Sequence, residues 1–183
     1  MRKPKIGVIV GSTSRVSINR RLSGAIRYSG RDLFEFEEIP VADLPLYNRD
    51  MDADLPRAVQ DAKRQIEGVE GILIVSPEYN RSLPSALKNL LDWGSRPYGK
   101  SSWRGKCAAI AGASTGALGT AVSQTHLRTV LTHLDVVVLP QPELYIQWRE
   151  GLLNESNEPN SPEFNKILDT FSNNFFELLR RNG

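Results

Sequence analysis

The chain has 183 residues, a formal net charge of +2 and one cysteine, Cys107. Its length fits one domain, residues 1–183, which can bury about 70% of its unfolded surface. The small net charge gives no reason to expect a nucleic-acid or membrane partner. One cysteine excludes an intrachain disulfide and a cysteine metal cluster. The apolar run after the basic residues 1–5 is too short for a signal peptide or a membrane span, so we expect a cytoplasmic protein.

The first predicted strand, residues 6–10, is a β-branched apolar run typical of a strand buried on both faces. It leads through Gly11 into a turn of hydroxyl and basic residues, and then into a helical pattern. A helix N-terminus carries unpaired N–H groups and the positive end of the helix dipole, so this turn predicts an anion site. The candidate side chains are Ser12, Ser14, Arg15, Ser17 and Asn19. The alternative is that Ser17 only caps the helix and that water solvates the other hydroxyls.

The glycine content of this turn indicates which kind of phosphate it suits. Only Gly11 occurs there, so the G-x-G-x-x-G fingerprint of dinucleotide-binding proteins is absent. A turn that binds through hydroxyls suits a terminal phosphate monoester, which carries about two negative charges near neutral pH. The sequence therefore favours a mononucleotide such as FMN over FAD.

Strands and helices alternate along the rest of the chain. We predict further strands at residues 34–39, 69–75, 106–111 and 136–139, the first of them near a sheet edge. We predict helices at residues 19–28, 55–66, 82–93, about 120–134 and 161 onward. Ser82 is expected to cap the third helix and Ser161 the last. The inward side of the last helix is expected to carry Phe164, Ile167, Leu168, Phe171, Phe175, Phe176 and Leu179.

This alternation predicts a parallel, doubly wound α/β sandwich. Ligands bind such sheets beyond the carboxyl ends of the strands. Polar turns at residues 11–17, 76–81 and 112–119 each follow a predicted strand. They therefore fall on one edge of the sheet and can converge on a single ligand.

On these turns the chain resembles the NADPH-dependent FMN reductase family of flavodoxin-like proteins, which includes bacterial quinone, chromate and azo-dye reductases. The similarity extends from about residue 5 to residue 144. The residues that carry the similarity are Gly11-Ser12, Ser17-Ile18-Asn19, Pro77-Glu78-Tyr79-Asn80, Ser82-Leu83-Pro84 and residues 87–93. The middle motif, which begins at Pro77, is the most specific part of this set. The resemblance implies a flavodoxin-like three-layer sandwich with a five-stranded parallel sheet in the order 2-1-3-4-5.

The resemblance also implies a set of cofactor-binding residues. It assigns the FMN phosphate to Ser12, Ser17, Ile18 and Asn19. It assigns the isoalloxazine ring to Pro77, Glu78, Tyr79, Asn80 and Arg81 on one side, and to Ser114, Thr115 and Gly116 on the other. Relatives commonly have an arginine where this chain has Ser14, so Arg15 either reaches the phosphate by another path or points to solvent. The alternative for Tyr79 is a packed aromatic residue at a strand end.

The implied activity is that of an FMN-containing oxidoreductase that passes electrons from NADPH or NADH to a quinone, azo, metal-oxyanion or flavin acceptor. Because the flavin carries the redox step, no catalytic side chain and no metal ligand is expected. The alternative is a flavodoxin-type electron carrier, which usually needs a more strongly charged face than this chain has. By analogy with the family we expect a homodimer or homotetramer, with Leu127, Arg128 and Leu131 as candidate interface residues.

Three other signals have simpler interpretations. Residues 94–101 match G-x-x-x-x-G-K-S, but a helix precedes this string and a strand follows it, which is not the context of a P-loop. His126 and His133 have no cysteine or carboxylate pair nearby, so we expect partly buried or interface histidines rather than a metal site. Cys107 is expected in the core rather than as a reactive thiol.

Overall fold

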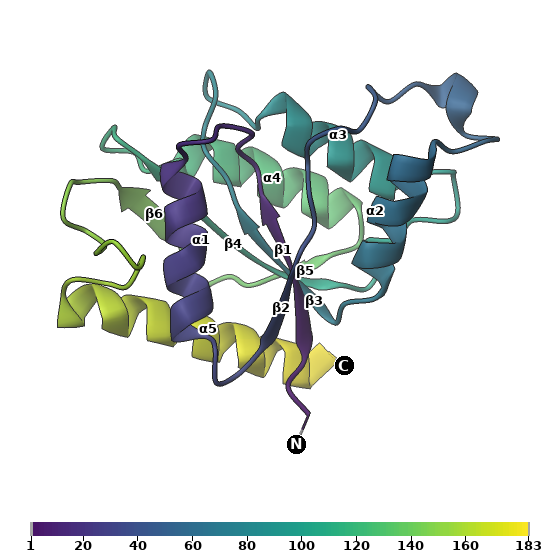
Figure 1. Cartoon of the computed structure of the whole chain (residues 1–183). Coiled ribbons are helices and arrows are strands. Elements are labelled where there is room, and N and C mark those ends of the chain that lie inside the picture. The colour runs from purple at the N-terminus through teal and green to yellow at the C-terminus, as the bar shows by residue number, and fades with distance from the viewer. Residues whose placement is uncertain (1, 183) are drawn as a thin grey trace.

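In the computed structural model, which describes residues 2–182, a parallel β-sheet lies between two layers of helices (Figure 1). The strands are β1 (Lys5–Val10), β2 (Glu35–Glu38), β3 (Gly71–Val75), β4 (Cys107–Ser114), β5 (Val137–Val138) and β6 (Leu144–Gln147). The helices are α1 (Ile18–Ser29), α2 (Arg57–Glu67), α3 (Ser85–Gly94), α4 (Ala121–His133) and α5 (Pro162–Asn182). A short 3-10 helix spans Arg49–Met51. Within residues 2–182, no helix combines the length and the apolar character that a bilayer span requires.

The strand order is β2-β1-β3-β4-β5, with every pair parallel, as the flavodoxin-like prediction requires. The strand predicted at residues 136–139 is shorter than expected, and β6 was not among the predicted strands. β5 pairs with Cys107 and Ala108, whereas β6 pairs with the far half of β4. Pro140 and Pro142 lie between β5 and β6. Proline has no N–H to donate to a ladder, so the chain leaves the sheet here and returns as β6.

One apolar cluster packs on each face of the sheet. α1 and α5 cover one face, where Leu22 and Phe171 are fully buried. α2, α3 and α4 cover the other face, where Leu127 and Leu131 are each 1% exposed. Leu127 and Leu131 therefore belong to the core, and the expectation that they form a subunit interface is wrong. Ile167 is 43% exposed, so its predicted inward position is also wrong.

Two predicted boundaries next to the polar turns differ from the structure. α3 begins at Ser85 with Pro84 at its N-cap, so Ser82 does not cap this helix. β4 does not end at residue 111 but continues to Ser114, because β6 supplies a hydrogen-bonding partner there. Gly112 suits this extension, since a Cβ at this position would lie 2.4 Å from the carbonyl oxygen of Ser76.

Candidate functional site

Three loops follow three neighbouring parallel strands and leave the sheet at the same edge (Figure 1). Loop 1 (residues 11–17) follows β1, loop 2 (residues 76–84) follows β3, and loop 3 (residues 115–120) follows β4. Because the carboxyl ends of parallel strands share an edge, the structure brings the three predicted polar turns together. This edge is the candidate functional site.

Loop 1 ends in a helix N-terminus with free donors. Ser17 caps α1, since its Oγ accepts the backbone N–H of Arg20 at 3.2 Å, and the hydroxyl proton of Ser17 remains available. Within residues 2–182, the backbone N–H groups of Ile18 and Asn19 have no hydrogen-bond acceptor. The first turn of α1 carries no acidic side chain. Unpaired donors at the positive end of the helix dipole make this turn suited to an anion.

The remaining polar side chains of loop 1 differ in what they have left to offer. The buried Ser12 hydroxyl accepts the backbone N–H of Ser14 at 3.3 Å and keeps its own proton free. The Ser14 hydroxyl turns back on the loop and donates to the carbonyl of Val16 at 3.1 Å. Arg15 is exposed and forms no ion pair with any residue in the range 2–182. Ser12 and Arg15 are therefore free to donate to a ligand, whereas Ser14 is already engaged.

Asn19 has a different environment from the other candidate residues of loop 1. Its side chain is 1% exposed and forms two hydrogen bonds with the backbone of Ala113, at the end of β4. The side-chain oxygen accepts the Ala113 N–H, and the side-chain nitrogen donates to the Ala113 carbonyl. Asn19 therefore fixes the start of α1 against the strand that leads into loop 3.

Loop 2 contains a tight turn with two left-handed residues. Tyr79 and Ser82 exchange backbone hydrogen bonds of 3.0 Å in both directions. Between them, Asn80 has φ 50° and Arg81 has φ 65°, the pattern of a type I′ turn. Asparagine tolerates this conformation better than arginine does, so Arg81 is the strained member. In the described part of the chain, the N–H groups of Asn80 and Arg81 have no protein acceptor.

Loop 2 is anchored to α4 by two side chains. The Glu78 carboxylate accepts the backbone N–H of Ser123 at 3.0 Å in the first turn of α4, and its second oxygen accepts from Arg81 at 3.2 Å. A carboxylate at this end of a helix is stabilised by the helix dipole. Ser82 contacts Nδ1 of the exposed His126 at 3.1 Å. These contacts engage the side chains of Glu78 and Arg81, so loop 2 presents mainly backbone donors and the half-exposed ring of Tyr79.

Loop 3 is held close to β6 and leaves an exposed tip. The Ser114 hydroxyl donates to the carbonyl of Gly116 at 3.1 Å, and residues 115–118 are exposed. Gly119 has φ 54°, and a Cβ there would lie 2.4 Å from the backbone of Tyr145. A side chain at residue 119 would therefore push loop 3 away from β6. Leu118 is 50% exposed at the loop tip.

The contacts that join the loops are the part of the site that sequence reasoning missed. Neither the Glu78 cap on α4 nor the pair between Ser82 and His126 was predicted, because both connect residues about 45 positions apart. The sequence carried no signal for them, because threonine is a common N-cap residue and only the structure shows that Thr120 makes no capping bond to α4.

The structure gives no support for metal binding by the two histidines or for a reactive thiol at Cys107. Among residues 2–182, no group of three or more His, Cys, Asp or Glu side chains could hold a metal ion. His126 and His133 are exposed, so the expectation of partly buried histidines is wrong, and the alternative of interface histidines stays a prediction. Cys107 is 3% exposed, and its burial raises the pKa of the thiol, so it is not poised to react.

Comparison with known proteins gives a consistent result. A family model described as NADPH-dependent FMN reductase matches residues 4–149. A 2-hydroxy-1,4-benzoquinone reductase from Burkholderia sp. is 44% identical over 176 residues, which are 96% of each chain. A quinone reductase from Pseudomonas putida is 35% identical over 171 residues, covering 91% of this chain and 92% of the relative.

A solved structure is also closely similar over almost the whole chain. FerB, a flavoenzyme NAD(P)H:(acceptor) oxidoreductase from Paracoccus denitrificans, superposes with a TM-score of 0.95. It is 36% identical, and the match covers 98% of this chain and 99% of that one.

Proposed function

The chain belongs to the NADPH-dependent FMN reductase family, and we propose that loops 1, 2 and 3 hold its FMN. It is an NAD(P)H-dependent oxidoreductase that uses FMN, rather than an electron carrier without pyridine-nucleotide activity. The observation that carries the proposal is the meeting of three loops on one sheet edge, each with free groups that suit a different part of FMN.

The free donors of loop 1 fit the FMN phosphate. The backbone N–H groups of Ile18 and Asn19, the hydroxyls of Ser12 and Ser17, and the Arg15 guanidinium all remain available. A phosphate monoester with about two negative charges can accept from all of them, and each charge-assisted bond is stronger than a neutral one. Asn19 contributes its backbone N–H directly and its side chain through the contact with Ala113.

Loops 2 and 3 fit the isoalloxazine ring. The free N–H groups of Asn80 and Arg81 suit the carbonyl-rich pyrimidine edge, and the half-exposed Tyr79 offers a flat surface beside it. On the other side, an added Cβ at Gly116 would meet nothing closer than the Ser114 hydroxyl at 3.8 Å, so a planar group can approach this backbone. Bound FMN supplies the hydride and electron chemistry. The two N–H groups of loop 2 would stabilise the negative charge that the ring gains on reduction.

We propose a quinone as the electron acceptor. The relatives from Burkholderia and Pseudomonas putida are named for quinone reduction. Leu118 and Tyr79 are each about half exposed at the site, which gives a planar aromatic acceptor an apolar surface. The overall reaction takes one quinone, one NAD(P)H and one proton to one hydroquinone and one NAD(P)⁺.

We also propose that the enzyme works in the cytoplasm as a homodimer or homotetramer. Reduced pyridine nucleotides are supplied in the cytoplasm, which supports this location. Val16, at the tip of loop 1, is 92% exposed. A subunit that covered this side chain would also shield the site from water. Sedimentation of the FMN-loaded protein measures the oligomeric state, and a strict monomer would contradict this part of the proposal.

Steady-state kinetics with the FMN-reconstituted protein test the function. We expect NADPH or NADH oxidation that depends on added 2-hydroxy-1,4-benzoquinone or menadione, with bound FMN and with no gain from FAD. Azo dyes, chromate and free FMN serve as competing acceptors, ranked by kcat/KM. A protein that binds FMN but oxidises pyridine nucleotide equally with and without quinone would refute the quinone proposal and leave the cofactor assignment standing.

A further inference from the structure

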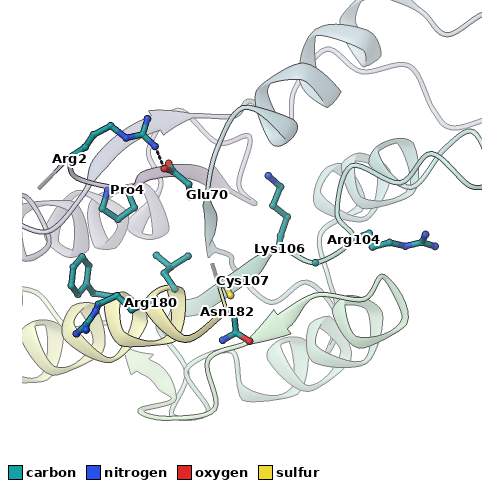
Figure 2. Close-up of a pocket in the computed structure, with 11 residues that line it drawn as sticks. Arg2, Pro4, Glu70, Arg104, Lys106, Cys107, Arg180 and Asn182 are labelled. Carbon is teal, nitrogen blue, oxygen red and sulfur yellow. Dashed lines mark hydrogen bonds and ion pairs between the residues drawn. The ribbon is translucent and has the colours of Figure 1, made fainter.

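A hollow of about 690 Å³ lies at the opposite edge of the sheet from loops 1–3, and Figure 2 shows the residues that line it. Its walls come from the starts of β1, β3 and β4 and from the last turns of α5. Small-molecule sites commonly enclose roughly 300–1,000 Å³, so the hollow is large enough for a ligand. None of the residues that line this hollow belongs to loops 1–3.

The floor of the hollow is apolar. It is formed by Pro4, by Cys107 at the start of β4, and by Phe176 and Leu179 on α5. An added Cβ at Gly71 would lie 2.8 Å from Leu179, so α5 is packed tightly against the sheet at this point. The floor is therefore a fixed surface of the core rather than a set of mobile loop side chains.

The rim of the hollow is cationic. Arg2, Arg104, Lys106 and Arg180 line it, with Glu70 as the one carboxylate among the lining residues. Glu70 is already engaged, because it pairs with Arg2 and accepts the backbone N–H of Lys5 at 2.6 Å. In Figure 2 the Arg2–Glu70 pair and α5 lie on opposite sides of the apolar centre. The lining residues of the rim are thus four cations and one carboxylate, while Asp135 and Glu177 pair with Arg104 and Arg180 from outside the lining.

Two of these cations are free to turn toward a ligand. Arg104 has a loose pair with Asp135 at 3.9 Å, and Arg180 pairs with Glu177 at 2.9 Å. Both arginines are mostly exposed, and exposed ion pairs contribute little, so exchanging them for a ligand anion costs little. Lys106 is held by the carbonyl oxygens of Glu67 and Val69 and serves as a fixed charge.

We propose that this hollow binds a small amphipathic anion, with an apolar body of one or two rings or a short alkyl chain and a carboxylate or sulfonate at the rim. An inorganic anion would leave the apolar floor wet, and a neutral apolar molecule would leave the rim charges without a partner. A second copy of this chain is a poorer fit. In a twofold dimer the same patch meets itself, so the cations would face cations.

The test uses 1-anilinonaphthalene-8-sulfonate as the probe and the full-length protein with and without FMN. Calorimetry is expected to give one site per chain in both forms. Amide resonances in two-dimensional NMR spectra should shift at residues 105–107 and 176–182 and stay unchanged in loops 1–3. Shifts confined to loops 1–3 would overturn the proposal, because the probe would then occupy the other edge of the sheet.

Charge reversal separates the effect of the rim arginines on probe binding from the effect of the protein's net charge. The double variant Arg104→Glu/Arg180→Glu is expected to weaken probe binding by about tenfold. The matched control Arg49→Glu/Arg57→Glu makes the same charge change at exposed positions in the 3-10 helix and at the start of α2, which do not line the hollow, and binding should stay within about twofold. N-phenyl-1-naphthylamine, which lacks the sulfonate, should bind more weakly and respond equally to both doubles. The proposal would be overturned if both double variants lost the same affinity for the sulfonate probe. Self-association of the chain that blocks probe binding would overturn it as well.

Discussion

Asn19 and Ala113 lie 94 positions apart in the sequence and form a closed pair of hydrogen bonds. Nδ2 of Asn19 donates to the Ala113 carbonyl at 2.9 Å, and the Ala113 N–H donates to Oδ1 at 2.8 Å. Asn19 stands in the first turn of α1, directly after loop 1, and Ala113 stands one residue before the end of β4. This pair therefore sets the position of loop 1 relative to loop 3.

Replacing Asn19 by alanine should lower the free energy of unfolding by about 1–3 kcal/mol, because both polar groups of a buried peptide lose their partner. Urea unfolding without FMN measures this change. Asn173→Ala is the matched control, since the Asn173 amide also donates to a backbone carbonyl, that of Asp169, but at an exposed position. We expect a change of roughly 0.5 kcal/mol or less for the control. Equal effects of the two substitutions would contradict the structural role of Asn19.

Two serines allow capping to be separated from phosphate binding. Ser17 accepts the Arg20 N–H at 3.2 Å, and Ser161 accepts the Phe164 N–H at 3.1 Å, so each caps a helix in the same way. Alanine at either position should lower the free energy of unfolding by about 1 kcal/mol.

Of these two variants, only Ser17→Ala should also weaken FMN binding, by about 1–3 kcal/mol, because a hydrogen bond to a charged acceptor is lost. Quenching of FMN fluorescence measures the dissociation constants. If Ser17→Ala and Ser161→Ala bind FMN equally well, then Ser17 only caps α1 and the phosphate is held by other groups.

The order of strands and helices was predictable because local sequence patterns indicate each of them. β1 and β3 are continuous apolar runs, and α1 and α5 have serine caps that the spacing reveals. The split between β5 and β6 was not predictable in the same way. β6 is a short strand, and it is a strand only because the far half of β4 is available to pair with it. That availability is a property of the assembled sheet.

The site was predictable as three loops but not as three sets of contacts. The hydroxyls and glycines that mark loops 1 and 3 are visible in the sequence. The hydrogen-bond partner of each group is not visible in the sequence. Ser14 bonds within its own loop, and Glu78 caps a helix 45 positions away. Such partners depend on which loops the sheet brings together, and a single chain's spacing does not contain this information.

Loop 2 offers a test of backbone binding. Arg81 has φ 65°, a conformation that glycine adopts freely and that a β-branched residue adopts only at a cost of roughly 1–2 kcal/mol. Arg81→Gly should therefore keep FMN affinity close to that of the native protein, whereas Arg81→Val should weaken it by about 1–2 kcal/mol. FMN titration measures both. Loss of affinity in the glycine variant comparable to that in the valine variant would mean that the arginine side chain, not the turn, binds the cofactor.

Lys63 predicts a pH dependence of stability. Its ammonium group donates to the carbonyls of Gly94 and Lys100 and to the Ser102 hydroxyl, and burial lowers the pKa of this group, partly offset by the charge of Glu67. Between the lowered folded pKa and the ordinary unfolded value, the unfolded chain binds more protons, so the contribution of Lys63 to stability rises with pH.

Lys63→Met removes this titration. The difference in unfolding free energy between the native protein and this variant should therefore grow in favour of the native protein as the pH rises toward 10.5, the ordinary pKa of lysine. Urea unfolding at several pH values measures the difference. A difference that stays constant, or that shrinks as the pH rises, would contradict the lowered pKa of Lys63.

Substitutions at Tyr79 test the reduction of FMN separately from its binding. Tyr79 is 48% exposed in loop 2, so the fold should tolerate Tyr79→Glu, and loop 1 should still bind the FMN phosphate. A carboxylate beside the ring opposes the negative charge that reduction adds, and we expect anaerobic reduction by NADPH to slow by about tenfold or more. Tyr79→Phe keeps the flat surface and should reduce normally. Tyr98→Glu is the matched control, because Tyr98 is 92% exposed and lies outside the three loops. Absorbance measures how much FMN each variant holds, and stopped-flow absorbance measures the rate of its anaerobic reduction by NADPH. A Tyr79→Glu protein that holds FMN and is reduced at the native rate would make Tyr79 a packing residue, and the ring would then lie away from loop 2.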